Sequence, residues 1–340
     1  MTLTFGNGLA FAPELWLLVG ALVILAMTVA SPRAGRAPII VALVAVAGGL
    51  LSLATQLRTP LNVLNGSFVL DGYAVLLDVV VLLAAGLYLL LSLAEDQPPP
   101  RAAGSLAFVL LGTCGGMLLV SAANVLSFFA AQELLAVSVL IAIGLRETRR
   151  HSVIASLVAG LAASAIVAYG MAVAYGLTGE TALAGIGRVL ATRGAHDLPT
   201  VLVLVLVVGG AVFRLTAVPF RWLSDDQDPA TSGTRALAAA LLVVAGFGAL
   251  QRVVALTVAP TAVPWPVLLA GLATVLLVLG TMGALGERRL ARAVAFAGLG
   301  QAGFILMGLA ASRQRSGLAG VGVLLAGAAP AILAATIPTG

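Results

Sequence analysis

The sequence predicts an all-α, polytopic membrane protein with about 11 transmembrane helices, and three observations support this. Of the 340 residues, 61% are hydrophobic and 9% are charged, whereas about a quarter of the residues in a typical soluble domain are charged. The mean hydropathy is +1.13. Apolar runs of the roughly 20 residues that a helix needs to cross a bilayer recur along almost the whole chain. These properties exclude an ordinary soluble domain.

The predicted spans follow one another with short polar breaks between them. They cover residues 13–31, 37–56, 73–94, 104–121, 124–145, 152–177, 199–221, 235–257, 265–286, 290–311 and 317–338. The first run is not predicted to be a cleaved signal peptide, because no basic region precedes it and Glu14 stands at its start.

Two connections are longer than the others. Residues 57–72 contain Pro60 and Gly66 and are expected to form an irregular loop, and residues 179–198 fit one short amphipathic helix at the surface. Neither has room for a nucleotide, flavin or iron–sulfur domain, and the single cysteine, Cys114, excludes a disulfide or Cys-rich metal site within the chain. We expect no cofactor and no metal, so a partner would supply any redox chemistry.

All 18 basic residues are Arg, and most of them fall in the breaks between spans. Cytoplasmic loops are enriched in Arg and Lys, so the charge indicates membrane orientation and no nucleic-acid partner. With the N-terminus outside, the inner side holds eleven Arg residues: Arg33, Arg36, Arg101, Arg146, Arg149, Arg150, Arg221, Arg235, Arg288, Arg289 and Arg292. The outer side holds six: Arg58, Arg188, Arg193, Arg252, Arg313 and Arg315. This asymmetry predicts an outer N-terminus.

Ionisable residues within spans are costly, which makes each one a candidate functional residue. Three stand out: Glu133 near the middle of the fifth span, Arg214 in the seventh, and Asp78 nearer the outer end of the third. Glu14 is close enough to a span end that we expect it to be solvated.

Glu133 and Arg214 are expected to pair, because an isolated guanidinium in a low-dielectric medium cannot escape by losing its proton. Two interpretations remain open. In one, the pair is a static contact between two helices; in the other, Glu133 titrates in a proton relay and Arg214 tunes it.

The seventh span also contains Pro219, with Gly209 and Gly210 upstream. Proline removes a backbone hydrogen bond and clashes with the preceding turn, and broken helices in bilayers occur where the freed groups face protein or water. We therefore expect either a broken helix beside Arg214 or a simple proline kink.

Glycine patterns in two spans predict close helix packing. Gly298, Gly300 and Gly303 match GxGxxG, but they lie inside an apolar span and not after a strand, so a dinucleotide site is not expected. Gly112 and Gly116 form a GxxxG pair with the same packing interpretation.

Several segments together resemble a known family. They are LLVSAANVLSFFAAQELLAVSVLIAIGL at 118–145, VAYGMAVAYGLTGETALAGI at 167–186, and the run Phe213, Arg214, Leu215, Val218, Pro219, Phe220 and Arg221. The chain is identified from them as similar to the antiporter-like subunits of respiratory complex I, in particular the subunit N family of bacterial NADH-quinone oxidoreductase. The resemblance implies an inverted-repeat fold with two five-helix repeats, each with a broken helix, and buried charges across the membrane midplane.

The resemblance also assigns positions in the family's proton relay. The carboxylate of the fifth helix is Glu133, and the lysine of the seventh is replaced by Arg214. The lysine of the eighth helix falls at Val243, the histidine of the tenth at Gln301, and the histidine after the broken-helix proline at Arg221. A buried Lys can release a proton, whereas Arg effectively cannot. We therefore expect a degenerate proton channel in which Glu133 still titrates.

The resemblance divides the single transmembrane domain, residues 1–340, into three parts. Residues 1–103 are three N-terminal helices, 104–258 the first repeat, and 259–340 a partial second repeat. The family usually continues with a second broken helix, another lysine and two more spans, so the expectation is a C-terminally shortened member with its second repeat incomplete.

The function implied is that of a membrane-arm subunit of a complex I-type NADH-quinone oxidoreductase in a bacterial cytoplasmic membrane, with a structural or coupling role. Other hydrophobic membrane-arm subunits and lipid are the expected partners, and quinone is expected to bind elsewhere in the complex. Two alternatives remain: an antiporter-like subunit of a membrane-bound hydrogenase or of a multi-subunit cation/proton antiporter, and a stand-alone secondary transporter.

Overall fold

The computed structural model describes residues 10–30, 35–54, 61–93, 102–146, 150–193, 197–224, 229–258 and 261–311. These residues form eleven α-helices, one π-helical turn and a two-stranded antiparallel sheet. The helices are α2 (Ala12–Ala30), α3 (Ala37–Leu53), α4 (Gly72–Leu93), α5 (Ala102–Ser121), α6 (Val125–Arg146), α7 (Arg150–Thr178), α8 (Leu183–Ala191), α9 (Leu198–Ser224), α10 (Pro229–Val253), α11 (Trp265–Gly286) and α12 (Leu290–Ala311).

The predicted spans agree with the observed helices. Each of the first ten coincides with one helix to within a few residues. Among the described residues, eight helices are long and apolar enough to cross a membrane, and Ala37–Leu53 and Ala295–Ala311 are shorter apolar helices. The predicted span 317–338 lies outside the described residues.

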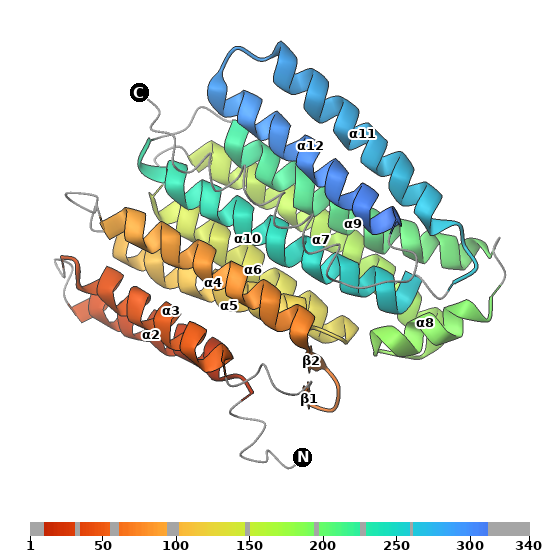
Figure 1. Cartoon of the computed structure of the whole chain (residues 1–340), viewed down its shortest axis with the longest axis horizontal. Coiled ribbons are helices and arrows are strands. Elements are labelled where there is room, and N and C mark those ends of the chain that lie inside the picture. Colours follow the sequence, from red (N-terminus) through yellow and green to blue (C-terminus); the bar gives the residue numbers. More distant parts are fainter. Residues whose placement is uncertain are drawn as a thin grey trace.

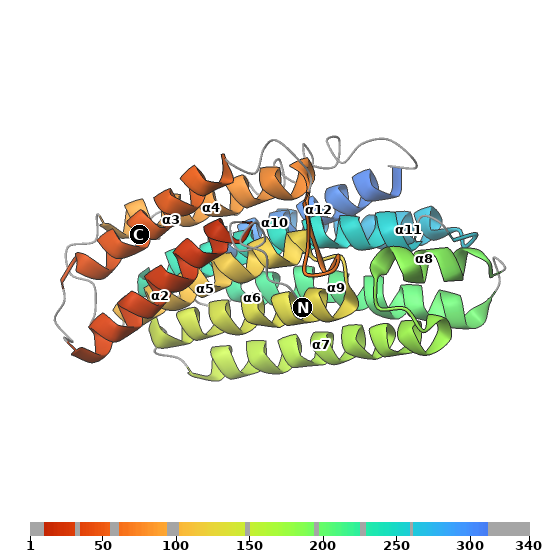
Figure 2. The ribbon, with the colours of Figure 1, turned by 90° about the horizontal axis from the view of Figure 1, so that it is seen from below.

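The long helices lie roughly parallel, as expected for a bundle that crosses a bilayer (Figure 1). The α2–α3 pair forms one edge, α4, α5, α6 and α10 occupy the middle, and the α11–α12 pair forms the other edge. Seen from the side, α7 covers one face (Figure 2). The middle is the core of the bundle. In the apolar stretch of the α10 region (Gly233–Val258), 89% of the residues are buried inside the molecule, whereas in that of α11 only 22% are buried.

The connection predicted as an irregular loop at 57–72 contains a hairpin instead. Strands β1 (Leu61–Val63) and β2 (Phe68–Leu70) pair antiparallel. Asn65 and Gly66 have positive φ angles of 58° and 81°, the conformation that Asn-Gly favours in tight turns. The irregular-loop prediction is therefore wrong, because it considered Pro60 and Gly66 and not the short apolar segments that flank the turn.

The expected amphipathic helix in 179–198 is present as α8. It buries Leu183, Ile186 and Leu190 and exposes Arg188. It packs on the π-helical turn Val254–Val258, where a Cβ on Gly187 would overlap the carbonyl oxygen of Leu256. The hairpin and α8 lie at the same end of the bundle (Figure 1).

The seventh predicted span forms a continuous helix. The backbone of α9 is helical from Leu198 to Ser224, through Pro219, so the predicted break at Pro219 is wrong for this structure. Proline removes only one hydrogen bond of the helix. A π-helix is present instead at Val254–Val258, at the end of α10 that packs on α8.

Glycines allow the helices to approach closely at Gly303 and Gly112, as predicted, whereas a Cβ on Gly298 would meet nothing within 4 Å. A Cβ on Gly303 would lie 2.8 Å from the carbonyl oxygen of Ala273, so α12 packs directly on α11 there. On α5, a Cβ on Gly112 would lie 3.0 Å from Val139 Cγ1, and one on Gly115 would lie 2.6 Å from the backbone nitrogen of Leu135. This last contact fixes the position of α6.

Candidate functional site

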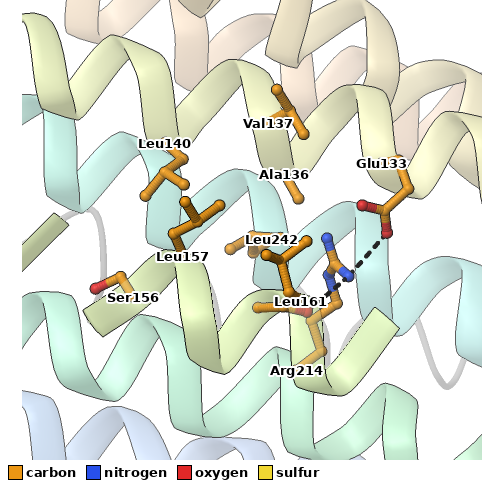
Figure 3. A pocket seen from close by; sticks show the side chains of 10 residues that line it. Glu133, Ala136, Val137, Leu140, Ser156, Leu157, Leu161, Arg214 and Leu242 are labelled. Atoms are coloured by element: carbon orange, nitrogen blue, oxygen red, sulfur yellow. Dashed lines mark hydrogen bonds and ion pairs between the residues drawn. The ribbon is translucent and has the colours of Figure 1, made fainter. Parts of the chain in front are cut away.

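Glu133 and Arg214 form an ion pair between two membrane-spanning helices. Glu133 lies on α6 and Arg214 on α9, 81 positions apart in the chain, and Arg214 Nη1 donates to Glu133 Oε1 over 3.0 Å. The two side chains point toward one another (Figure 3). The Arg214 side chain is 4% exposed and that of Glu133 is 26% exposed, so the cation is the more deeply buried partner.

Ser164 on α7 completes the site. Its hydroxyl lies 2.7 Å from Glu133 Oε1 and 2.9 Å from the carbonyl oxygen of Gly160, and it also accepts a hydrogen bond from Arg214 Nη1. A serine hydroxyl carries one hydrogen, so it can donate to the carboxylate or to the carbonyl, but not to both at once.

Glycine contacts bring the three helices together. A Cβ on Gly170 would lie 2.8 Å from Leu206 Cβ, and one on Gly210 would lie 2.9 Å from Ile166 and Val167. These contacts hold α7 against α9, so the short serine side chain reaches the guanidinium. The sequence has apolar side chains around these glycines, which favours close packing of the two helices in lipid.

A pocket opens beside the ion pair, between α6 and α7 (Figure 3). Glu133, Arg214 and Ser156 are its polar lining residues, and the remainder of the lining is Leu, Val, Ala and Gly. Leu157 and Leu161 on α7 face Leu140 on α6 across it. The surroundings of the pair are therefore apolar, and the electrostatic attraction between its members is stronger than it would be in water.

The chemistry of the site follows from its residue types. A guanidinium cannot be deprotonated in a protein, so Arg214 stays cationic. Glu133 can accept or lose a proton, and Ser164 can exchange its single hydrogen-bond donor between the carboxylate and Gly160. Within this site, the described residues thus provide one carboxyl group, Glu133, paired with one permanent positive charge, Arg214.

Two of the other predicted relay residues, Val243 and Gln301, do not line this site. Val243 on α10 is a half-buried apolar side chain, and its neighbour Leu242 lines the pocket instead. Gln301 on α12 is half-buried and does not line the pocket. The side chains of Pro219 and Arg221 lie outside the described residues.

The sequence analysis missed Ser164, because a single serine in an apolar helix has no distinguishing pattern. The expectation that Glu14 is solvated is wrong, since Glu14 is 5% exposed. Helix α2 packs against α3 and α5. Arg252, assigned to an outer loop, is 8% exposed and forms an ion pair with Asp71 at 2.8 Å.

The family of the chain is decided by comparison with known proteins. Residues 122–329 match the model of the family described as NADH:quinone oxidoreductase/Mrp antiporter, TM. The chain belongs to this family. The matched range contains Glu133, Ser164 and Arg214, so all three residues of the site lie in the part that defines membership.

Curated members of the family resemble most of this chain. One is NAD(P)H-quinone oxidoreductase subunit 2 from Prochlorococcus marinus (strain AS9601), 31% identical over 316 residues that cover 91% of this chain and 62% of the relative. Another is NADH-quinone oxidoreductase subunit N from Geobacillus kaustophilus (strain HTA426), 33% identical over 88% of this chain and 64% of the relative. The chain spans less than two thirds of the length of these relatives.

Solved structures share the fold. A chain of respiratory complex I from Thermus thermophilus with bound aureothin matches 95% of this chain and 70% of its own length, with a TM-score of 0.71 and 21% identity. A chain of the archaeal membrane-bound sulfane sulfur reductase covers 95% of this chain and 68% of its own length, with a TM-score of 0.79 and 18% identity. The antiporter-like membrane fold implied by the sequence is therefore confirmed.

Proposed function

We propose that the chain is a membrane-arm subunit, similar to subunit N, of a complex I-type NADH-quinone oxidoreductase. The observation that carries the proposal is the Glu133–Arg214 ion pair, in which Arg214 is buried and Glu133 partly exposed, within the residues that match the family. The names of the curated relatives place them in NAD(P)H- or NADH-quinone oxidoreductases. Electron transfer and quinone binding belong, in this proposal, to other subunits.

The outer faces of the bundle suit hydrophobic partners and lipid. Large apolar side chains are exposed on edge helices, for example Trp16 and Leu22 on α2, at 46% and 57%, and Val267 and Met282 on α11, each at 70%. Exposed apolar surface of this extent is stable only against lipid or another membrane subunit. We propose a location in a bacterial cytoplasmic membrane, with the N-terminus outside.

The role we propose within the complex is structural or coupling. Arg214 keeps its proton, and Val243 has none to give, so a proton on Glu133 has no lysine at these two positions to move to. Helices α6, α7, α9 and α10 contribute the residues of the pair and its pocket, and we propose residues 104–258 as one five-helix repeat of the fold. Glu133 and Arg214 then join two helices of that repeat.

Affinity purification of the tagged chain from its native membrane tests the assignment. We expect co-purification with several hydrophobic membrane-arm subunits and with NADH-oxidising activity. Recovery of the chain alone or as a homo-oligomer would contradict the proposal and favour a stand-alone transporter.

One alternative function is favoured by a specific observation. The fold is as similar to a chain of the sulfane sulfur reductase as to complex I, and the family description also includes Mrp antiporters. An antiporter-like subunit of a membrane-bound hydrogenase or of a multi-subunit cation/proton antiporter is thus the second candidate. Co-purification with hydrogenase subunits or with other subunits of a cation/proton antiporter would support this second candidate and overturn the complex I assignment.

A further inference from the structure

A pair of buried carboxyl groups lies outside the Glu133–Arg214 site. Glu14 is in the first turn of α2 and Asp78 in the second turn of α4, with exposures of 5% and 1%. Both oxygens of Asp78 and the Oε2 atom of Glu14 are buried and have no hydrogen-bond partner in the structure. Neither residue contributes to the pocket between α6 and α7.

The two carboxyl groups share one environment. They interact electrostatically with each other, and both interact with the buried thiol of Cys114 on α5. Asp78 lies six residues after the start of α4, which is about 9 Å along the helix at 1.5 Å per residue. The groups are thus within the membrane-spanning bundle and not in the solvated loop at its end.

The burial of the Asp78 and Glu14 carboxyl groups without hydrogen-bond partners favours their protonated, neutral form. An ionised carboxylate transferred to an apolar environment without hydrogen bonds is so costly that it takes up a proton instead. A second carboxylate nearby adds like-charge repulsion. The one cation within electrostatic reach of Asp78, among the described residues, is Arg252, and Arg252 already donates to Asp71 at 2.8 Å.

Polar groups lie within electrostatic reach of Asp78 at the end of the bundle that bears the hairpin. Asp71, whose side chain is 36% exposed, accepts from the backbone nitrogen of Ala74 and from Arg252. Tyr73 lies under the Arg252 guanidinium, with 5.7 Å from ring centroid to Cζ, and its hydroxyl lies 3.0 Å from Gln251 Oε1. Asp78 interacts electrostatically with both Asp71 and Arg252.

The remaining neighbouring helix adds no titratable group. Helix α3 packs on α2 and α4 and contains none between Ala37 and Leu53. The groups that face Asp78 are therefore Glu14 from α2, Cys114 from α5, Arg252 from α10 and Asp71 before α4.

We propose that Asp78 and Glu14 form a proton-binding site, separate from the Glu133–Arg214 pair, that exchanges protons with the hairpin end of the bundle through the carboxylate of Asp71, while Arg252 keeps its proton and acts only through its charge. A carboxylate gains one proton and becomes a neutral acid; no other bond changes. The proposed ligand is a proton; the described residues contain no group of three or more His, Cys, Asp or Glu side chains that could hold a metal. The inference does not depend on which complex contains the chain.

Infrared spectroscopy of the purified full-length protein in lipid tests the site. At neutral pH we expect the carbonyl band of a protonated carboxylic acid that is lost in Asp78→Asn and altered in Glu14→Gln, whereas Glu133→Gln retains it. The same band is expected to disappear at alkaline pH. Absence of any difference between the native protein and Asp78→Asn would overturn the proposal, because Asp78 would then be ionised.

The thermal stability of Asp78→Asn provides a second test. Asn has nearly the shape of a neutral Asp, so Asp78→Asn is expected to keep the native thermal midpoint. A large fall in that midpoint would contradict the proposal, because it would mean that a charged and partnered Asp78 had been removed.

Deuterium exchange tests the path. In D₂O the band of the protonated acid shifts, and we expect the shift to be slower in Asp71→Asn than in the native protein. An unchanged rate would contradict exchange through Asp71. Replacing choline chloride by sodium chloride at constant pH is expected to leave the band unchanged, and its loss would show that the site binds sodium.

Discussion

At the scale of single residues, the identity of residue 214 determines what the site can do. Arg214 is 3% exposed and contacts both Glu133 and Ser164. A lysine there could become neutral by giving up its proton, whereas the guanidinium keeps its charge. The same residue therefore stabilises the carboxylate of Glu133 and offers it no neutral base to which a proton could move.

Removing both members of the pair is expected to cost less than the sum of the two single changes. Arg214→Met leaves Glu133 without its cation and should lower the free energy of unfolding by about 2 kcal/mol, less than for a fully buried pair because Glu133 is partly exposed. Glu133→Gln preserves a hydrogen-bond acceptor and should cost about 1 kcal/mol.

Reversible unfolding in detergent of both single variants and of the double variant measures the coupling. We expect the double variant to be about 1 kcal/mol more stable than the sum of the single changes predicts. Strict additivity would show that the two side chains do not stabilise one another.

At the scale of helices and strands, apolar length predicted almost all of the described spans. Apolar length did not predict the elements that consist of only a few residues. The hairpin at 61–70 consists of two three-residue strands, and the turn between them is recognised only when Asn65 and Gly66 are considered together. Pro219 was given too much weight, since the backbone of α9 accommodates it as helix.

Gly115 is expected to be essential for placing α6. A Cβ there would lie 2.6 Å from the backbone nitrogen of Leu135, two residues beyond Glu133. Gly115→Ala should therefore cost about 1–3 kcal/mol by forcing the helices apart.

Gly104→Ala, on the same helix, is the matched control for Gly115→Ala. Its Cβ would meet Leu145 Cδ1 at an ordinary 3.5 Å, so it should be neutral or stabilising by up to about 1 kcal/mol. Equal thermal midpoints for the two variants would contradict the packing argument.

Asp197 caps α9 and makes its first turn sensitive to acid. Its carboxylate accepts from the hydroxyl and backbone nitrogen of Thr200, at 2.5 and 3.2 Å, and from Arg193 at 3.3 Å. These contacts, the Thr200 hydroxyl above all, lower the pKa of Asp197 below its ordinary value. A lowered pKa in the folded protein means that the contribution is complete above the ordinary pKa and is lost as pH falls through the lowered one.

Thermal unfolding at a series of pH values checks this account of Asp197. Asp197→Asn, which keeps a capping oxygen, should have a lower thermal midpoint than the native protein at neutral pH. The difference should vanish as the pH falls below about 4. A difference independent of pH would argue against an ionised cap.

At the scale of the whole molecule, the sequence predicted the bundle and the central pair but not the groups around them. Glu133 and Arg214 were found because charges inside apolar runs are rare. Ser164, Glu14 and Asp71 were not found as contacts, because their roles depend on which helices pack together, and that packing is set by glycines such as Gly115 and Gly210. Apolar composition specifies that a segment spans the membrane, but not which neighbour it contacts.

The proposed topology can be tested with engineered cysteines. Cys114, the natural cysteine, is 5% exposed and should contribute little background. An impermeant maleimide applied to intact cells should label Thr192→Cys, which follows α8, and should label Arg288→Cys, between α11 and α12, only after the membrane is permeabilised. The reverse pattern would place the N-terminus inside.

We propose that this chain has a structural or coupling role in its complex and that no proton passes through the Glu133–Arg214 pair. The ratio of protons translocated to electrons transferred, measured on the assembled native complex and on Glu133→Gln in sealed vesicles, tests this most directly. We predict that the variant complex assembles and keeps the native ratio. A large fall in the ratio, with assembly intact, would contradict the claim and show that Glu133 conducts protons.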